Sequence, residues 1–181
     1  MAALGIRTYG DPVLRAQAEP VARIDQTVEQ LVQGMVETMY EDHGVGLAAP
    51  QVGTSQRLIV VDLSLGQDQD HPLPMINPRI GEAEGEEALE EGCLSLPDIY
   101  ETVVRAARIT VAYQDLAGEG KQMDCNGLLA RIVQHETDHL DGMLFVDRIS
   151  LLKRQLLGAR LRRLAREGGR HATQSSGKVL I

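Results

Sequence analysis

Apolar residues recur at helical spacing in a stretch near the start of the chain. The pattern begins after Asp25, whose carboxylate suits a helix N-cap, and it ends near His43 and Gly44. Its apolar positions are Val28, Leu31, Val32, Met35 and Met39. One stripe of apolar side chains on an otherwise polar helix predicts packing of that face against a core.

A second stretch with the same spacing begins after Asn126 and Gly127 and ends at Gly142. Its inward-facing positions are Leu128, Leu129, Ile132, Val133, His135, Glu136, His139 and Leu140. Histidine and glutamate on the face expected to be buried indicate that this helix carries chemistry as well as packing.

Four segments rich in β-branched and aromatic residues lie between these two helices, at residues 57–63, 74–80, 102–113 and 121–125. The strands cluster instead of alternating with helices, which favours an α+β fold over a doubly wound one. We therefore expect mainly antiparallel sheets packed around a central helix that begins after Asn126. An N-terminal helix and a C-terminal helix complete the predicted fold.

Composition limits the class of protein. A chain of 181 residues with 43% hydrophobic content fits one globular domain. Two cysteines argue against a disulfide framework, and no signal peptide or apolar run of about 18 residues is visible. No phosphate-binding or dinucleotide motif is present, so a nucleotide cofactor is not expected. We expect a cytoplasmic protein with neither a membrane nor DNA as a partner.

Charge is distributed unevenly along the chain. Residues 151–181 carry a net charge of +7, whereas residues 1–150 carry −15. Leucines at helical spacing over 152–164 predict a basic helix, which could pack on the acidic body or contact ribosomal RNA. Glutamates crowd positions 82–91, where we expect a solvated hairpin or loop. Glu91 is the expected exception, because Arg105 could pair with it and fix the loop beside Cys93.

Residues 135–139 form an HExxH motif. Imidazoles four residues apart on a helix lie one above the other and can bind a single cation. Glu136 would then lie beside the water on that cation, which is the arrangement of a metallohydrolase. The alternative is that His135 and His139 are core histidines bonded to the backbone.

A catalytic metal site needs a third protein ligand, and Cys93, Cys125 and the acidic residues are candidates. Cys93 lies in a segment between Gly92 and Pro97 that suits a ligand-bearing loop. Cys125 precedes His135 by ten residues, about 15 Å along an unbroken helix, which favours its being a buried apolar residue.

Three segments in the same order and spacing resemble those of the bacterial peptide deformylases: 44–53 (GVGLAAPQVG), 91–95 (EGCLS) and 134–139 (QHETDH). The resemblance covers roughly residues 5–150. We expect residues 1–168, including the basic C-terminal helix, to form one deformylase-like catalytic domain. Gly168 and Gly169 followed by a polar run predict a frayed tail at 169–181. The implied metal ligands are Cys93, His135 and His139. Iron(II) is the expected ion, with zinc, nickel or cobalt as substitutes.

The same resemblance implies an activity. The enzyme would hydrolyse the N-formyl group of formyl-methionine on nascent polypeptides, releasing formate, with Glu136 as base and acid while metal-bound water attacks the formyl carbon. Gln51 and the backbone N–H of Leu94 are implied donors to the oxyanion. The implied substrate-binding residues are Val45, Gly46 and Gly92, with the peptide added as a strand.

Three other interpretations of these segments compete with the deformylase. Composition alone would make residues 44–53 a small-residue turn between a helix and a strand. An HExxH metallopeptidase usually has a downstream carboxylate or histidine ligand, but Asp141 is too close to serve. A structural metal module would have no use for Glu136 beside an open position and would more often close with a fourth ligand.

Overall fold

The protein is described by a computed structural model that places residues 4–64, 66–67 and 72–167. Its helices are α1 (Gln26–Glu41), α2 (Gly127–Leu140), α3 (Leu151–Leu156) and α4 (Gly158–Glu167). Short 3-10 turns lie at Pro12–Arg15 (η1), Ala49–Val52 (η2) and Phe145–Asp147 (η3). None of the described helices is long and apolar enough to cross a membrane.

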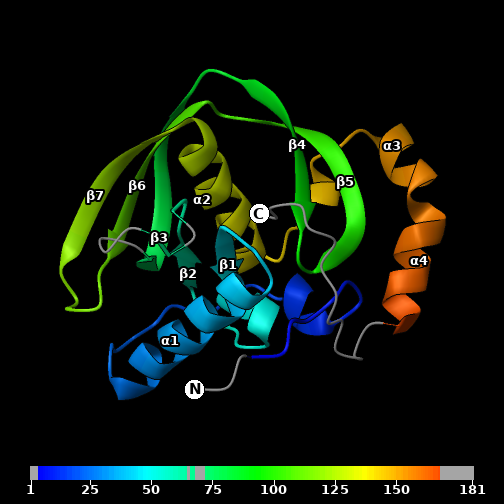
Figure 1. The fold of residues 1–181 in the computed structure, drawn as a ribbon. Coiled ribbons are helices and arrows are strands. Elements are labelled where there is room, and N and C mark those ends of the chain that lie inside the picture. The colour runs from blue at the N-terminus through cyan, green and yellow to red at the C-terminus, as the bar shows by residue number, and fades with distance from the viewer. Residues whose placement is uncertain (1–3, 65, 68–71, 168–181) are drawn as a thin grey trace.

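In the described part of the chain, seven strands form two antiparallel sheets: β1 (Gly46–Ala48), β2 (Leu58–Val61), β3 (Leu73–Glu84), β4 (Glu87–Cys93), β5 (Leu96–Arg105), β6 (Arg108–Gln114) and β7 (Gly120–Asn126). The larger sheet has the order β1-β2-β3-β6-β7, and β4 pairs with β5 alone. Figure 1 shows α2 between the larger sheet and the β4–β5 pair. The predicted α+β fold with a central HExxH helix is confirmed.

The two long helices begin where their sequences indicate. The Asp25 carboxylate accepts hydrogen bonds from the backbone N–H groups of Thr27 and Val28 at the start of α1. Asn126 is the N-cap residue of α2, but its side chain does not cap the helix and instead accepts a hydrogen bond from Arg108 at 2.9 Å. The position of this helix start was therefore predicted correctly and its side-chain bond was not.

Three apolar clusters hold the layers together. The first packs α2 on the larger sheet, with Ile132 and Val133 against strand residues such as Val111. The second packs α1 on β1 and β2 through Met35 and Met39, both fully buried. The third joins the β4–β5 pair to the C-terminal segments. Burying one such side chain contributes about 1.5–3 kcal/mol, so the first cluster fixes α2 on the larger sheet.

Two sequence expectations need correction. The run 102–113 is not one strand, since it ends β5, turns at Ala106 and Ala107, and begins β6. Ala106 is held by the Gln134 side chain, which accepts from its N–H at 3.1 Å and donates to its C=O at 2.9 Å. A helix side chain thus replaces a strand partner at the point where the chain changes sheets.

The predicted single C-terminal helix is divided into α3 and α4 at Leu157. Leu157 and Leu161 are buried in the third cluster, whereas Leu151, Leu152 and Leu156 are exposed. The two groups of leucines cannot lie on one buried stripe, and the turn lets only the second group pack. The predicted polar tail at 169–181 lies outside the described residues.

Candidate metal centre

Cys93, His135 and His139 converge in the interior of the protein. Cys93 ends β4, and the two histidines lie one turn apart on α2. Their ligand atoms all lie within 4.8 Å of one another, and each side chain is at most 1% exposed. No other such group of three potential ligands occurs in the described ranges. The structure therefore brings together the three residues that the sequence indicated as ligands.

The donor set fits a divalent transition metal. One thiolate and two imidazoles suit zinc or iron(II) and leave a coordination position for water. His135 Nε2 is buried and has no hydrogen-bond partner among the described residues, and His139 Nε2 lies 3.3 Å from Cys93 Sγ. An unsatisfied buried polar atom costs about 1–3 kcal/mol. A cation bound by these atoms would remove that cost.

The protonation of the cluster also points to a cation. Burial raises the pKa of the Cys93 thiol, and the nearby Glu136 carboxylate raises it further. Burial and the neighbouring His135 lower the pKa of His139 well below its ordinary value. The imidazole is thus available as a neutral ligand, whereas the thiol needs a positive ion to become a thiolate. Metal binding should therefore release a proton from Cys93.

A buried carboxylate orients one ligand. Glu91 is 1% exposed, and its Oε2 lies 2.9 Å from His135 Nδ1. Burial alone would raise the pKa of Glu91, but hydrogen bonds from His135 and Arg105 outweigh it and hold the pKa well below the ordinary value. An ionised Glu91 accepts the Nδ1–H of His135, so the lone pair of His135 Nε2 faces the cluster.

The predicted pairing of Arg105 with Glu91 is confirmed. Arg105 donates to the two carboxylate oxygens at 2.6 and 2.9 Å, and to Asp138 at 2.8 Å. The other glutamates of the predicted acidic hairpin are exposed or only partly buried. Sequence reasoning missed Arg131, which is 2% exposed on α2 and donates to Glu91 at 2.6 Å. The sequence could have indicated this residue, because Arg131 lies four positions before His135 on the predicted helix and so on the same face as that ligand.

Glu136 lies beside the cluster with both carboxylate oxygens buried and without hydrogen-bond partners in the described parts of the chain. Burial raises the pKa of Glu136 well above its ordinary value. β1 passes very close to it: a Cβ at Gly46 would lie 2.7 Å from Glu136 Oε1 and from Ile132 Cγ2. Only glycine at position 46 leaves room for this carboxylate. Gly46 is therefore required by packing as well as by its expected role in substrate binding.

Gln51 is buried in η2, and a backbone hydrogen bond fixes the orientation of its side-chain amide. Its Oε1 accepts a hydrogen bond from the Ala48 N–H at 2.7 Å, which directs Nε2 toward Cys93 Sγ at 3.5 Å. Leu94 follows Cys93 in the turn between β4 and β5, and its side chain lies 3.2 Å from the position of a Cβ on Gly44. The turn after β4 therefore faces the segment that leads into β1.

The remaining predicted site residues lie on these same segments. Val45 precedes β1, and its C=O accepts a hydrogen bond from the Asp62 N–H at 2.9 Å. Gly92 lies in β4 opposite Tyr100 of β5. Tyr100 packs partly against the second apolar cluster, which also contains Leu94.

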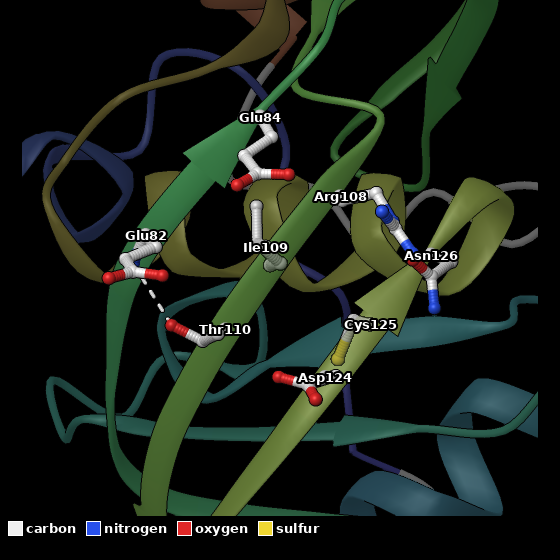
Figure 2. A pocket seen from close by; sticks show the side chains of 8 residues that line it. All are labelled: Glu82, Glu84, Arg108, Ile109, Thr110, Asp124, Cys125 and Asn126. Atoms are coloured by element: carbon white, nitrogen blue, oxygen red, sulfur yellow. Dashed lines mark hydrogen bonds between the residues drawn. The ribbon is translucent and has the colours of Figure 1, made fainter.

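A separate hollow of about 330 Å³ lies on the larger sheet, lined by Glu82 and Glu84 of β3 and by Asp124 of β7 (Figure 2). Cys125 borders it, with a fully buried side chain that belongs to the first apolar cluster. The expectation that Cys125 is a core residue is confirmed. None of the three clustered ligands lines this hollow.

Comparison with known proteins agrees with the site. The family model described as polypeptide deformylase matches residues 3–155. The peptide deformylase of Acidobacterium capsulatum is 53% identical over 160 residues, which cover 88% of this chain and 94% of that protein. That of Alkalilimnicola ehrlichii is 46% identical, with 99% of this chain and 100% of that protein covered.

Solved structures show the same likeness. The peptide deformylase of Thermus thermophilus superposes with a TM-score of 0.84 at 45% identity, covering 91% of this chain and 99% of that one. The Synechococcus elongatus enzyme, in complex with actinonin, gives 0.84 at 42% identity, covering 97% and 94%. On its fold, its metal cluster and these matches, the chain belongs to the peptide deformylase family.

Proposed function

We propose that this peptide deformylase removes the N-formyl group from the formyl-methionine of new polypeptides at the Cys93, His135 and His139 cluster. The observation that carries the proposal is the Glu136 carboxylate buried beside that cluster, which has no hydrogen-bond partner among the residues that the structure places. A divalent ion held by the three ligands would act as a Lewis acid and lower the pKa of a bound water to about 7. Formate and a free amino terminus are the products.

Glu136 moves the protons in this proposal. A formamide is a poor electrophile, so water must lose a proton as it attacks the formyl carbon, and the amide nitrogen must gain one as it leaves. Glu136 accepts the first proton on a carboxylate oxygen and gives it to the leaving nitrogen. The buried surroundings that raise its pKa favour the protonated form needed for the second transfer.

Gln51 and the backbone N–H of Leu94 stabilise the negative oxygen that develops on the formyl group. The Ala48 N–H holds the oxygen of the Gln51 amide, so the NH₂ group is the end presented to the cluster. A donor fixed before the reaction needs no reorganisation when charge develops.

Replacement of Gln51 by methionine keeps the length of the side chain and removes the donor. We expect kcat to fall about 10²–10³-fold, equivalent to about 2.7–4 kcal/mol, the loss typical of one oxyanion donor. Formate release under saturating substrate measures it, with Thr54→Val, beyond the end of η2, as the control. A Gln51→Met enzyme with the parent kcat would remove Gln51 from the mechanism.

The peptide substrate adds as a strand to β1, which lies at one edge of the larger sheet. Val45 bonds to Asp62, and Gly46 is the next position, opposite Val61. Backbone groups alternate in direction along an antiparallel strand, so the N–H and C=O of Gly46 point away from β2 toward the open edge. Main-chain bonds from Gly46, with Val45 and Gly92 as neighbours, would hold the peptide.

Iron(II) is the proposed native metal, with zinc, nickel or cobalt able to replace it. The thiolate and two imidazoles suit all four ions, and affinity order alone does not select among them. The proposal rests on the family to which the chain belongs. Iron(II) beside Cys93 makes the site sensitive to oxygen, because both the metal and the thiolate can be oxidised.

The basic C-terminal helices are proposed to contact ribosomal RNA near emerging nascent chains, which places the enzyme in the cytoplasm. Their inner side packs on the body, as Lys153 pairs with Glu101 at 2.7 Å and Leu161 is buried. Arg160, Arg162 and Arg163 of α4 are exposed. Figure 1 shows α3 and α4 along the outer side of β5. Exposed cations on a packed helix suit phosphate contacts.

Reversal of two of these charges, in Arg160→Glu with Arg162→Glu, should weaken co-sedimentation with ribosomes. The slope of log affinity against log salt should fall by about two, one unit for each lost phosphate contact. The exposed pair Arg23→Glu with Arg79→Glu makes the same change of net charge away from α4 and is the control. Equal weakening by both pairs would leave only a non-specific charge effect.

A further inference from the structure

Arg131 makes a fork of hydrogen bonds that ties α2 to both strands of the β4–β5 pair. One guanidinium nitrogen donates to Glu91 Oε1 at 2.6 Å and to the C=O of Val103 at 3.1 Å. The second terminal nitrogen, Nη2, donates to the C=O of Glu87 at 2.6 Å. The side chain is 2% exposed, so these bonds are made in the protein interior.

Two arginines donate hydrogen bonds to the Glu91 carboxylate. Oε1 accepts from Arg131 and Arg105, whereas Oε2 accepts from Arg105 and lies 2.9 Å from His135 Nδ1. Arg105 bonds to both oxygens and restrains the carboxylate from β5. Arg131 approaches Oε1 from α2 and leaves Oε2 as the oxygen that meets the imidazole.

We infer that Arg131 is a positioning residue, which holds Glu91 in the one orientation that fixes the His135 ring toward the metal. The inference rests on the proposed function of the Cys93, His135 and His139 cluster as the metal site. Arg131 and His135 are one turn apart on α2, so the arginine and the ligand it serves move with the same helix. The hairpin that carries Cys93 is held by the same guanidinium.

The test is the rate at which a chelator removes cobalt(II) from the loaded protein, together with the absorption spectrum of the bound cobalt. Partners of metal-ligating histidines affect metal affinity about 10–100-fold. Arg131 contacts Glu91 and not the histidine itself, so we expect an effect at the lower end of this range. Arg131→Met should release cobalt about tenfold faster and shift the absorption spectrum of the bound cobalt. Arg57→Met is the matched control, because Arg57 bonds to Asp141 at 2.7 Å just past the end of α2 and contacts no metal ligand.

The same substitution made in Glu91→Gln protein distinguishes positioning of Glu91 from mere support of the β4–β5 hairpin. In Glu91→Gln protein the oriented carboxylate is already lost, so adding Arg131→Met should change the release rate by less than about twofold. The same tenfold change in both backgrounds, or the parent rate and spectrum in Arg131→Met, would overturn the inference. Should Arg131→Met fail to fold, Arg131→Lys carries the test: an ammonium cannot reproduce the planar fork, and release must be severalfold faster.

These readouts do not depend on deformylation. Failure of the proposed function would appear as loaded protein that releases no formate, whatever the cobalt release rate. Failure of the positioning role would appear as unchanged cobalt release in protein that is fully active.

Discussion

Glu136→Gln protein is expected to bind one metal ion per chain and to release formate about 10⁴-fold more slowly than the parent. A single positioned acid or base contributes about 10²–10⁴-fold, and both proton transfers in the proposed reaction use this one carboxylate. Glutamine has nearly the same shape and fits the space beside Gly46. The expected loss is therefore in kcat, with little change in metal content or in the free energy of unfolding.

Glu90→Gln provides the matched control for this change. Glu90 is exposed on β4, three residues before Cys93, so the substitution removes the same charge near the site without entering it. Its kcat should equal that of the parent. A loss of less than tenfold in Glu136→Gln protein with full metal occupancy would contradict the assignment of both proton transfers to Glu136.

Cys93→Ser protein is expected to lose its metal on dialysis and, with it, all measurable formate release. A serine hydroxyl does not ionise near neutral pH and is a harder donor than a thiolate, so the site would keep only two good ligands. The side chain is nearly isosteric in a fully buried position. The loss should therefore appear in metal content measured by atomic absorption, in protein that remains folded by circular dichroism.

Cys125→Ser separates loss of a ligand from loss of a buried thiol. Cys125 is equally buried, but it lies in the first apolar cluster and outside the metal cluster. Its replacement should lower the free energy of unfolding by about 1–3 kcal/mol, the cost of burying an unpaired hydroxyl, and leave metal content unchanged. Retention of stoichiometric metal by Cys93→Ser protein would remove Cys93 from the ligand set.

Much of the central site could be predicted from sequence because its signals are local. Residues four apart on a helix share a face whatever the fold, so His135 and His139 were predictable as a pair from spacing alone. Cys93 is different, since 42 positions separate it from His135. Neither periodicity nor composition brings such distant residues together. The local sequence made Cys93 one of several candidates, and the family resemblance singled it out as the third ligand.

The features that were missed depend on tertiary contacts. α2 is packed on both sides, so Arg131 is buried although it lies off the apolar stripe, and an amphipathic pattern assumes one buried face. Ala106, at the break between β5 and β6, is hydrogen-bonded to Gln134, 28 residues away. The turn at Leu157 divides leucines with uniform helical spacing, because only Leu157 and the leucines after it reach the third cluster.

The most direct test of the account is formate release from an N-formyl-methionyl tripeptide by protein prepared without oxygen and reloaded with one iron(II) per chain. We predict steady release that disappears when a chelator removes the metal and returns when iron(II) is restored. Formate release that persists in metal-depleted protein, or none from protein shown to hold stoichiometric iron(II), would contradict deformylation at the Cys93, His135 and His139 site.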